Sequence, residues 1–390
     1  MLILCFSDCE VISVKEMLKK LTAVLLLGFM LSVALATALS NKKTRSDEEN
    51  RELESFPKFT LSSVTDGSFF SGLESYASDH LFKRSKWLSV KSHISRETGE
   101  NLVNGVFIGE DSLLDAEMSD REINGKAVEI INAFADSYKG TVYVAVIPTS
   151  SGVYGDKLPA YLLENPESRQ ISGLYGRISD DVRKIDAYNI LKMLNDNYIY
   201  FRNDTKWTSY GAYCVYRTVI QKLGFLPTPY DKYTIMHITD KFRGNLYNRT
   251  LYTDTKSDLI DIYDYPNGEK VVSCVSSDKY GNKQKKELYD MKMAENGYMY
   301  DMYLGEPVPV IEIETTVNNE KKLLVIKDSY ADCFIPFLTQ HYNKITVVSP
   351  EFTDGKLSDY ADLDDYEQTL ILFGIENVNS EKLFRDELLS

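Results

Sequence analysis

The sequence contains little of the chemistry that builds metal clusters or disulfide scaffolds. It has only five cysteines, and no two of them show the C-x-x-C spacing of a zinc site or a redox motif. Two of the five, Cys5 and Cys9, precede the first long hydrophobic run. We therefore expect no metal ion and no cofactor, and a fold that is stabilised by its hydrophobic core.

The chain also has too few basic residues to bind the regularly spaced phosphates of a nucleic acid. The chain has 44 Lys and Arg residues against 58 Asp and Glu residues, which gives a formal net charge of −14. No basic stripe stands out, so we expect no nucleic-acid partner. Histidine, the residue that most often serves as a general base near neutral pH, occurs only four times.

Apolar and aromatic residues are abundant by contrast. Hydrophobic residues make up 43% of the 390 positions, which is enough for one large core or two small ones. The chain has 27 tyrosines and 17 phenylalanines but only two tryptophans. The flat rings either pack in the core or line a surface that binds glycans, because such rings stack on the faces of sugars.

A charge-free hydrophobic run at residues 21–39 follows Lys19 and Lys20. Its length lies between a long secretory signal and the shortest helix that spans a membrane. Small residues such as Ala34 and Ala36 would allow signal cleavage. We favour a signal anchor over a cleaved signal peptide. In both cases we expect an extracytoplasmic protein, either anchored to the cell membrane by this helix or secreted.

The remaining segments are assigned by composition. Residues 1–20 are interpreted as a cytoplasmic stub or an incorrectly assigned start, and residues 40–66 as a polar stalk. Residues 67–390 are predicted to form one folded domain. Within it, residues 230–310 are rich in Tyr, Asp and turn-forming residues, which predicts a β-rich insertion.

The hydrophobic pattern after residue 67 alternates between strand and helix. Aliphatic and β-branched runs, of which residues 141–147 are the longest, are typical of strands that are buried on both faces. This alternation predicts an α/β fold with a mostly parallel, doubly wound sheet. The predicted strands are 104–108, 141–147, 198–201, 323–326, 345–348 and 369–373, and the predicted helices are 81–94, 123–138, 179–195 and 209–223.

Polar residues directly after two of these strands are the candidates for chemistry, because the ligand crevice of such a sheet lies at the carboxyl ends of its strands. Asp328-Ser329-Tyr330 follows the strand that ends at residue 326. A serine at such a turn is exposed, and helix N-terminal amides there can stabilise an oxyanion. Asp204-Thr205-Lys206-Trp207 follows the strand that ends at residue 201.

In their order and spacing these segments resemble the bacterial DHHW protein family and, more distantly, the SGNH-hydrolase-like domains of the alginate O-acetylation proteins. The resemblance covers most of the chain and implies a three-layer α/β/α fold. It also implies a triad of Ser, Asp and His that transfers or hydrolyses acetyl esters on a cell-surface polysaccharide or cell-wall glycan. The matching segments are 49–51 with 56–57, 79–84, 104–109, 147–148, 157–159, 242–244, 328–330 and 336–338.

The third member of the triad is missing here. Ser329 and Asp204 match the serine and the aspartate, but Lys206 stands where the family has its histidine. A solvated lysine with a pKa near ~10.4 is protonated and cannot activate a serine, although burial can lower that pKa. Of the four histidines, His237 is the nearest alternative base. Glu351 also replaces an arginine of relatives, which would oppose an anionic intermediate.

Three hypotheses follow from this departure. In the first, the protein is a serine-dependent carbohydrate O-acyl esterase or acyltransferase, with Ser329 as nucleophile, Asp204 as support and Lys206 as base. In the second, the triad is degraded and the protein is a catalytically silent module that binds glycan or a partner protein. In the third, it is a structural protein of the cell envelope with no ligand in the crevice. We favour the degraded triad.

Four further residues have both a functional and a structural interpretation. As site residues, they are predicted to bind substrate. As structural residues, Asp328 caps the helix that follows it, and the rings pack in the core. The four are Asp328, Tyr330, Trp207 and Tyr210.

Overall fold

A computed structural model describes residues 8–40, 42–117, 122–162, 165–295 and 299–385. The chain divides into two compact units, Met1–Ile94 and Ser95–Ser390. All candidate site residues belong to the second unit. The predicted domain limits, including a folded domain that begins at residue 67, stay a prediction.

The first unit begins with a long helix, α1 (Asp8–Leu39). Its stretch Lys15–Leu39, with 25 residues, is long and apolar enough to cross a membrane by length and composition, a test that a signal sequence also passes. The helix fits a signal anchor or a signal peptide. The other elements are β1 (Arg45–Ser46), β2 (Arg51–Glu52), α2 (Leu61–Thr65), α3 (Ser68–Asp79) and α4 (Arg84–Thr98), which continues into the second unit.

Two ion pairs join the short motifs of the first unit. Arg84 Nε lies 2.9 Å from Glu49 Oε1, and Arg51 Nη2 lies 2.6 Å from Asp79 Oδ1. The Arg51 guanidinium holds the pKa of Asp79 at about 2. Residues 49–51 and 79–84, which look like separate motifs in the sequence, therefore belong to one network.

An eight-stranded sheet forms the centre of the second unit. Its strands are β6 (Thr141–Ile147), β7 (Arg183–Ile185), β10 (Val271–Ser277), β11 (Lys283–Lys285), β12 (Val310–Thr315), β13 (Lys322–Lys327), β14 (Lys344–Val348) and β15 (Gln368–Gly374). Their order is β11-β10-β12-β14-β13-β15-β6-β7. From β14 to β7 all neighbours are parallel, whereas β12, β10 and β11 pair antiparallel. The predicted α/β class with a mostly parallel sheet is confirmed.

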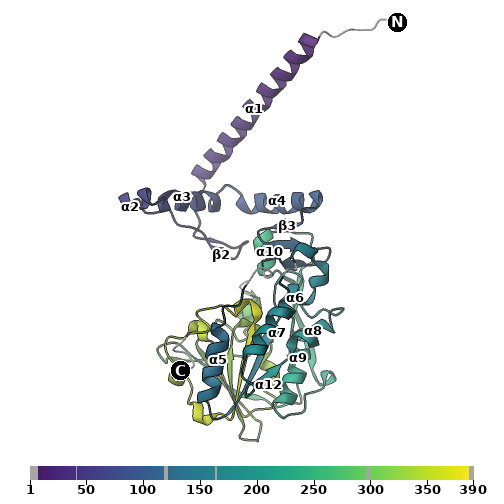
Figure 1. Ribbon diagram of the computed structural model, residues 1–390, viewed down its shortest axis with the longest axis vertical. Coiled ribbons are helices and arrows are strands. Elements are labelled where there is room, and N and C mark those ends of the chain that lie inside the picture. Colours follow the sequence, from purple (N-terminus) through teal and green to yellow (C-terminus); the bar gives the residue numbers. More distant parts are fainter. Residues whose placement is uncertain (1–7, 41, 118–121, 163–164, 296–298, 386–390) are drawn as a thin grey trace, which may run out of the picture. The chain divides into compact units, whose positions relative to one another are not determined.

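Helices cover both faces of this sheet (Figure 1). The helices are α5 (Lys126–Ser137), α7 (Glu167–Arg177), α8 (Ala187–Lys192), α9 (Ser209–Lys222) and α12 (Ile335–Leu338). Successive side chains of a strand point to opposite faces. On β6, Val144 packs in one core with α5 and α7, whereas Ala145 packs in the other core with α8, α9 and α12. The predicted three-layer arrangement is therefore confirmed.

Three predicted elements differ from the structure in their extent or in the sheet to which they belong. The predicted strand 104–108 is not part of the central sheet, because β4 (Val106–Ile108) pairs only with β3 (Leu102–Val103) and β5 (Leu113–Asp115) in a small antiparallel sheet. The predicted helix 179–195 contains β7 before α8. The predicted strand 198–201 contributes a single bridge, Tyr200 to Trp207. Of the three residues in β7 only Ile185 is buried, since this strand lies at the sheet edge, and so its sequence lacks a hydrophobic run.

The β-rich region predicted at 230–310 consists of two parts. The first part is an antiparallel pair, β8 (Thr234–Phe242) with β9 (Asp258–Asp264), and encloses α10 (Asn245–Thr250). The second part contains β10 and β11, which extend the central sheet through β12. Two short helices, α6 (Ser150–Val153) and α11 (Met291–Glu295), complete the unit.

Candidate functional site

The turn that contains Ser329 follows β13 and is built around the carboxylate of Asp328. Asp328 Oδ1 accepts a hydrogen bond of 2.8 Å from Tyr330 N and caps the short 3-10 helix Ser329–Ala331. Its Oδ2 accepts from Gly374 N at 2.7 Å and from Asn377 Nδ2 at 2.8 Å. The interpretation of Asp328 as a helix cap is confirmed. Burial raises the pKa of Asp328 above its ordinary value.

Ser329 itself is exposed at the surface of this turn. Its carbonyl oxygen accepts a hydrogen bond of 3.1 Å from the Tyr300 hydroxyl. Among the residues that the structure describes, none forms a hydrogen bond with the Ser329 hydroxyl. The hydroxyl is therefore accessible, but no neighbouring base is in place to take its proton.

Asp204 is buried and holds its own loop together. Its Oδ1 accepts from Lys206 N at 3.0 Å, and its Oδ2 accepts from Asn245 N at 2.8 Å. Gly244 packs directly on this carboxylate, because a Cβ atom at Gly244 would lie 2.0 Å from Asp204 Oδ2. The glycine of the 242–244 motif is thus required by the close approach of Asp204.

Aromatic residues bring the two candidate segments together. Trp207 is fully buried, and its Nε1 donates a hydrogen bond of 2.8 Å to the carbonyl oxygen of Tyr330. The buried Tyr330 donates in return to the carbonyl oxygen of Thr205 at 3.2 Å. The segments 204–207 and 328–330 therefore lie next to each other, as predicted. The ring of Tyr210 packs on Tyr230 with 5.6 Å between centroids. A substrate contact by these rings stays a prediction, and the contacts observed are packing contacts.

Lys206 is half-buried between two rings and a carboxylate. Its Nζ lies 4.0 Å from Asp204 Oδ1, 5.1 Å from the ring centroid of Tyr300 and 5.9 Å from that of Tyr330. These distances describe an ammonium ion held by a carboxylate and by two aromatic faces. In the described part of the chain, Lys206 makes no hydrogen bond to Ser329.

The charges around Lys206 keep it protonated. Burial by itself lowers the pKa of Lys206, but the carboxylates of Asp204, Glu376, Asp328 and Asp332 raise it, and the net direction is upward. A general base needs the opposite shift. The environment therefore opposes the role of base that the sequence assigns to Lys206.

Glu376 and Asn377, which follow β15, lie close to the candidate residues but were not predicted from the sequence. Asn377 donates to Asp328 and thereby ties the end of β15 to the Ser329 turn. Burial raises the pKa of Glu376 to about 7, against the opposing effect of Lys206. Both residues lie just beyond the predicted strand 369–373. Functional residues of a parallel sheet gather at the carboxyl ends of its strands, so this position is the signal in the sequence that points to them.

The loop after β6, together with Glu167 at the start of α7, was also not predicted as part of this region. Glu167, at the start of α7, accepts a hydrogen bond of 2.8 Å from Thr149 N and a further one from the Thr149 hydroxyl. Glu167 is only 4% exposed, and this burial raises its pKa to about 7. Ser150 N donates to the carbonyl oxygen of Thr205 at 3.1 Å, so the loop is joined to the Asp204 segment.

Neither of the two histidines in the second unit replaces the missing base. His237 is exposed and pairs with Asp261 at 2.6 Å. His341 is buried, bonds the Tyr216 hydroxyl at 2.6 Å, and has a pKa that burial lowers to about 4. No bond from either to Ser329 occurs among the described residues.

A small cavity of ≈ 70 Å³ lies beside Ser329. Its lining includes the acidic residue Glu351 and the Lys327 ammonium, which pairs with Asp332. The other acidic residues of the lining are Asp301, Glu306 and Asp328. Such a cavity disfavours an anionic ligand. In the described ranges no group of three or more His, Cys, Asp or Glu side chains is placed to hold a metal ion.

Comparison with known families and structures places these features in context. The sequence model of the DHHW protein family matches residues 49–125 and 89–348, well over half of the chain. A comparison with curated proteins found no match.

Solved structures with the same fold were found in several bacteria. A DHHW family protein from Eubacterium siraeum has a TM-score of 0.62 and 20% identity, covering 74% of this chain and 97% of that one. Bacillus cereus PatB1 with a sulfonyl adduct has a TM-score of 0.61 and 18% identity, covering 72% and 98%. At these identities the likeness shows the fold, which is SGNH-like. The O-acetyltransferase domain of Pseudomonas putida AlgJ is more distant, with a TM-score of 0.42 and 13% identity over 70% and 92%.

Proposed function

Because the chain belongs to the DHHW protein family, we propose that it is an extracytoplasmic envelope protein that descends from an acyl esterase or acyltransferase and has lost serine-dependent chemistry. Its ligand is a cell-surface polysaccharide or cell-wall glycan, and the acyl group of the ancestral reaction is acetyl. The observation that carries the proposal is the charged side chain of Lys206, held by Asp204 at the position where the family resemblance implies a histidine.

The loss follows from the protonation state of Lys206. At an ordinary lysine pKa of about 10.4, roughly one side chain in 2,500 is neutral at pH 7. The surrounding carboxylates raise the pKa of Lys206 and make the neutral form rarer still. The hydroxyl of Ser329 consequently lacks a base at physiological pH, since Lys206 does not hydrogen-bond it in the described structure.

Asp204, the acidic member of the triad pattern, and Asp328, which precedes the candidate serine, both have structural contacts that explain their presence without catalysis. Asp328 binds three hydrogen-bond donors and closes the Ser329 turn onto the end of β15. Asp204 anchors its loop to Asn245 at the start of α10. Both carboxylates are needed for the fold, so the pattern of a triad persists in a site without a base.

The location at the cell surface is supported by α1. Its stretch Lys15–Leu39 is long and apolar enough to cross a membrane, and the match to the family begins after it, at residue 49. We propose that α1 anchors the protein to the cell membrane and that residues 40–66 act as the stalk. No stripe of basic residues that could bind a row of phosphates stands out in the sequence, which agrees with a glycan rather than a nucleic acid as the ligand.

The proposal is tested by restoring the base. A structure of PatB1 contains a sulfonyl adduct, so a sulfonyl fluoride is the first probe to use for Ser329. We expect the wild-type protein to remain unlabelled and to leave p-nitrophenyl acetate intact. Lys206→His should gain labelling at Ser329, read by mass spectrometry, and ester hydrolysis of about 10²-fold or more over background, the usual contribution of a general base.

The control is the double variant Lys206→His with Ser329→Ala, which should show neither labelling nor hydrolysis. Circular dichroism melts of all variants establish that they are folded. Hydrolysis by the wild-type protein that disappears in Ser329→Ala would show an active enzyme and contradict the proposal. A silent module that binds a protein partner is the alternative, and capture of glycan by the wild-type protein argues against it.

A further inference from the structure

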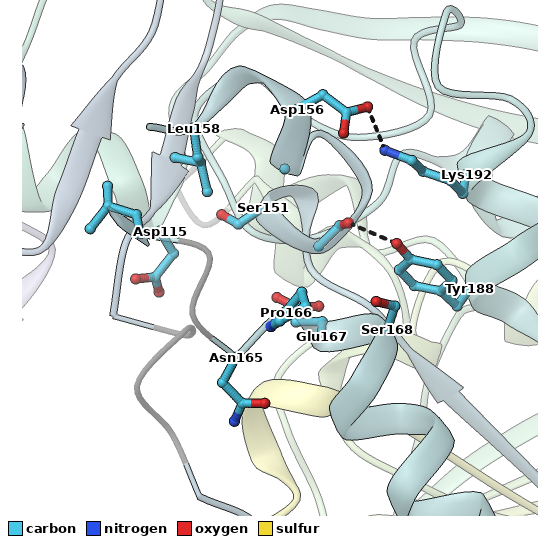
Figure 2. A pocket seen from close by; sticks show the side chains of 13 residues that line it. Asp115, Ser151, Asp156, Leu158, Asn165, Pro166, Glu167, Ser168, Tyr188 and Lys192 are labelled. Carbon is cyan, nitrogen blue, oxygen red and sulfur yellow. Dashed lines mark hydrogen bonds and ion pairs between the residues drawn. The ribbon is translucent and has the colours of Figure 1, made fainter. Parts of the chain in front are cut away.

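A second and larger cavity lies at the carboxyl end of β6, away from Ser329, Asp204 and Lys206, none of which lines it. We call it the β6 cavity; its volume is ≈ 260 Å³. Figure 2 shows its lining residues, which come from the end of β5, the loop after β6, the start of α7, and α8. Ser151 and Glu167 are buried on its inner side, whereas Ser168 and Tyr188 are half-exposed and Asp156 is exposed. The cavity therefore reaches from the protein interior to solvent.

The Ser151 hydroxyl is the feature that points to a ligand. Ser151 is only 5% exposed, and its Oγ has no hydrogen-bond partner among the described residues. Figure 2 shows this hydroxyl directed into the cavity, on the side of Asp115. Buried hydroxyl groups in native proteins are nearly always hydrogen-bonded, so a lone one that faces a cavity needs an explanation. A ligand with its own hydroxyl groups supplies the missing partner.

The charged groups of the cavity are already paired. Asp115 Oδ2 lies 3.2 Å from Arg249 Nη1, and Asp156 Oδ2 lies 2.8 Å from Lys192 Nζ. Both carboxyl oxygens of Glu167 accept from Thr149, and burial favours its neutral form. No unpaired cation is available for an anionic ligand within the described lining, and the acidic residues would repel one. The ligand that fits is uncharged.

The walls and the size restrict the ligand further. Leu158, Leu162 and Pro166 provide apolar surface, and Tyr188 provides an aromatic ring whose hydroxyl lies 3.5 Å from the carbonyl oxygen of Gly152. Sugar rings combine an apolar face with hydroxyl groups at their edge and suit a wall of this kind. Drug-sized ligands need about 300–1,000 Å³, so this cavity accepts one ring rather than a chain.

We propose that the β6 cavity is a binding site for one uncharged pyranose residue, with the hydroxyls of Ser151 and Ser168 directed at the sugar hydroxyls and Leu158 and Tyr188 packed on its apolar face. The inference rests on the proposed function only for the origin of this sugar, a surface glycan. The loop that carries Ser151 is hydrogen-bonded to the Asp204 segment through Ser150, so a glycan bound here lies at the same edge of the sheet as the Ser329 turn.

Ligand-observed NMR tests the proposal directly. The full-length protein is kept in a detergent without a sugar headgroup, and saturation transfer is measured to the methyl pyranosides of glucose, galactose, mannose and N-acetylglucosamine. We expect transfer to at least one of them. Glucuronic acid should bind at least about 10-fold more weakly than the best neutral sugar, because its carboxylate meets acidic residues and no free cation.

Variants of Ser151 separate this site from binding elsewhere. Ser151→Ala removes the unpartnered hydroxyl and should weaken the best sugar about 5–10-fold, the effect of one hydrogen bond. Ser151→Leu fills the cavity and should abolish binding. Ser276→Ala removes a hydroxyl that is equally buried, 4% exposed against 5%, on β10, and should leave affinity unchanged.

Three results would overturn the proposal: no transfer to any of the neutral sugars with folded protein, equal affinity in wild type and Ser151→Ala, or a preference for glucuronic acid. The labelling of Ser329 is measured separately. If Ser329 of the wild-type protein is active, the proposed loss of chemistry is refuted and the sugar site is unaffected. If no sugar binds and Ser329 stays unlabelled, only the sugar site is refuted.

Discussion

The Ser329 turn and the β6 cavity lie at the same edge of one sheet, but they use their polar groups in different ways. In the turn, every oxygen of the Asp328 carboxylate is engaged with backbone or side-chain donors of the protein. In the cavity, the buried Ser151 hydroxyl is engaged with nothing that the structure describes. The Asp328 carboxylate is thus used for hydrogen bonds within the fold, whereas an unpartnered hydroxyl, that of Ser151, faces the neighbouring cavity.

The charged groups near the Ser329 turn also differ from those around the β6 cavity. Burial lowers the pKa of Lys206, but four carboxylates raise it and the net direction is upward, which opposes the predicted role of Lys206 as a base. Around the β6 cavity, Asp115 and Asp156 are each paired with a cation. The difference teaches that a triad pattern in the sequence and a capacity to act on a ligand can separate within one fold. The following variants sharpen or break this comparison, from the largest effect to the smallest.

We expect the largest difference in unfolding free energy between variants of two neighbouring residues of the turn, Asp328 and Ser329. Asp328→Ala leaves three donors without their acceptor in a buried position and should lower the free energy of unfolding by about 3–4 kcal/mol. Ser329→Ala removes no hydrogen bond within the described structure and should change it by less than about 0.5 kcal/mol. Urea denaturation of the two variants measures both values. A large loss for Ser329→Ala would mean that the hydroxyl has a structural partner, and the comparison would fail.

Gly244→Ala tests the anchoring of Asp204. The added Cβ would lie 2.0 Å from Asp204 Oδ2 and 2.4 Å from its Cβ, so the Asp204 loop must shift. We expect a loss of about 2–3 kcal/mol in urea denaturation, as for other overpacked sites. The control is Gly173→Ala in α7, where nothing lies within 4 Å of the new Cβ; this helical position should gain up to about 1 kcal/mol. Equal stability of the two variants would contradict the close contact.

The buried carboxyl of Glu167 predicts a dependence on pH. Its pKa is raised from 4.5 to about 7 in the folded protein, so between these values the native state holds more protons than the unfolded chain. Stability from this group is complete below pH 4.5 and is lost as the pH rises through about 7. Glu167→Gln removes the ionisation, and Thr149 can turn its hydroxyl to accept from the new amide.

The measurement is the difference in free energy of unfolding between Glu167→Gln and wild type at pH 4.5 and pH 8. This difference should move in favour of the variant by about 3 kcal/mol at the higher pH. A difference that is independent of pH would show that Glu167 is ionised throughout this range. In that case the β6 cavity would carry a negative charge, and its contrast with the charge-rich Ser329 site would disappear.

Hydrophobic patterns predicted the central strands well because burial on both faces leaves a local signature. Residues 141–147 coincide with β6, and the predicted runs 323–326, 345–348 and 369–373 lie inside β13, β14 and β15. The edge strand β7 left no such signature, since only Ile185 is buried in it. Which strand a segment pairs with is also not local, and residues 104–108 were assigned to the wrong sheet for that reason.

The candidate site shows the same division. Chain order was enough to single out Ser329, because it follows β13, a strand of the parallel sheet. Asp204 and Lys206 follow the segment 198–201, which forms only a single bridge, so the strand rule does not explain their place beside Ser329. The class of the fold was likewise predicted from hydrophobic pattern and order, whereas the expectation of a histidine at the position of Lys206 came from the family resemblance alone. The charge state of Lys206, the use of Asp328 as a cap and the unpartnered hydroxyl of Ser151 were decided only by the folded chain. Each depends on atoms from segments that are distant in sequence, and their distances and burial exist only after packing.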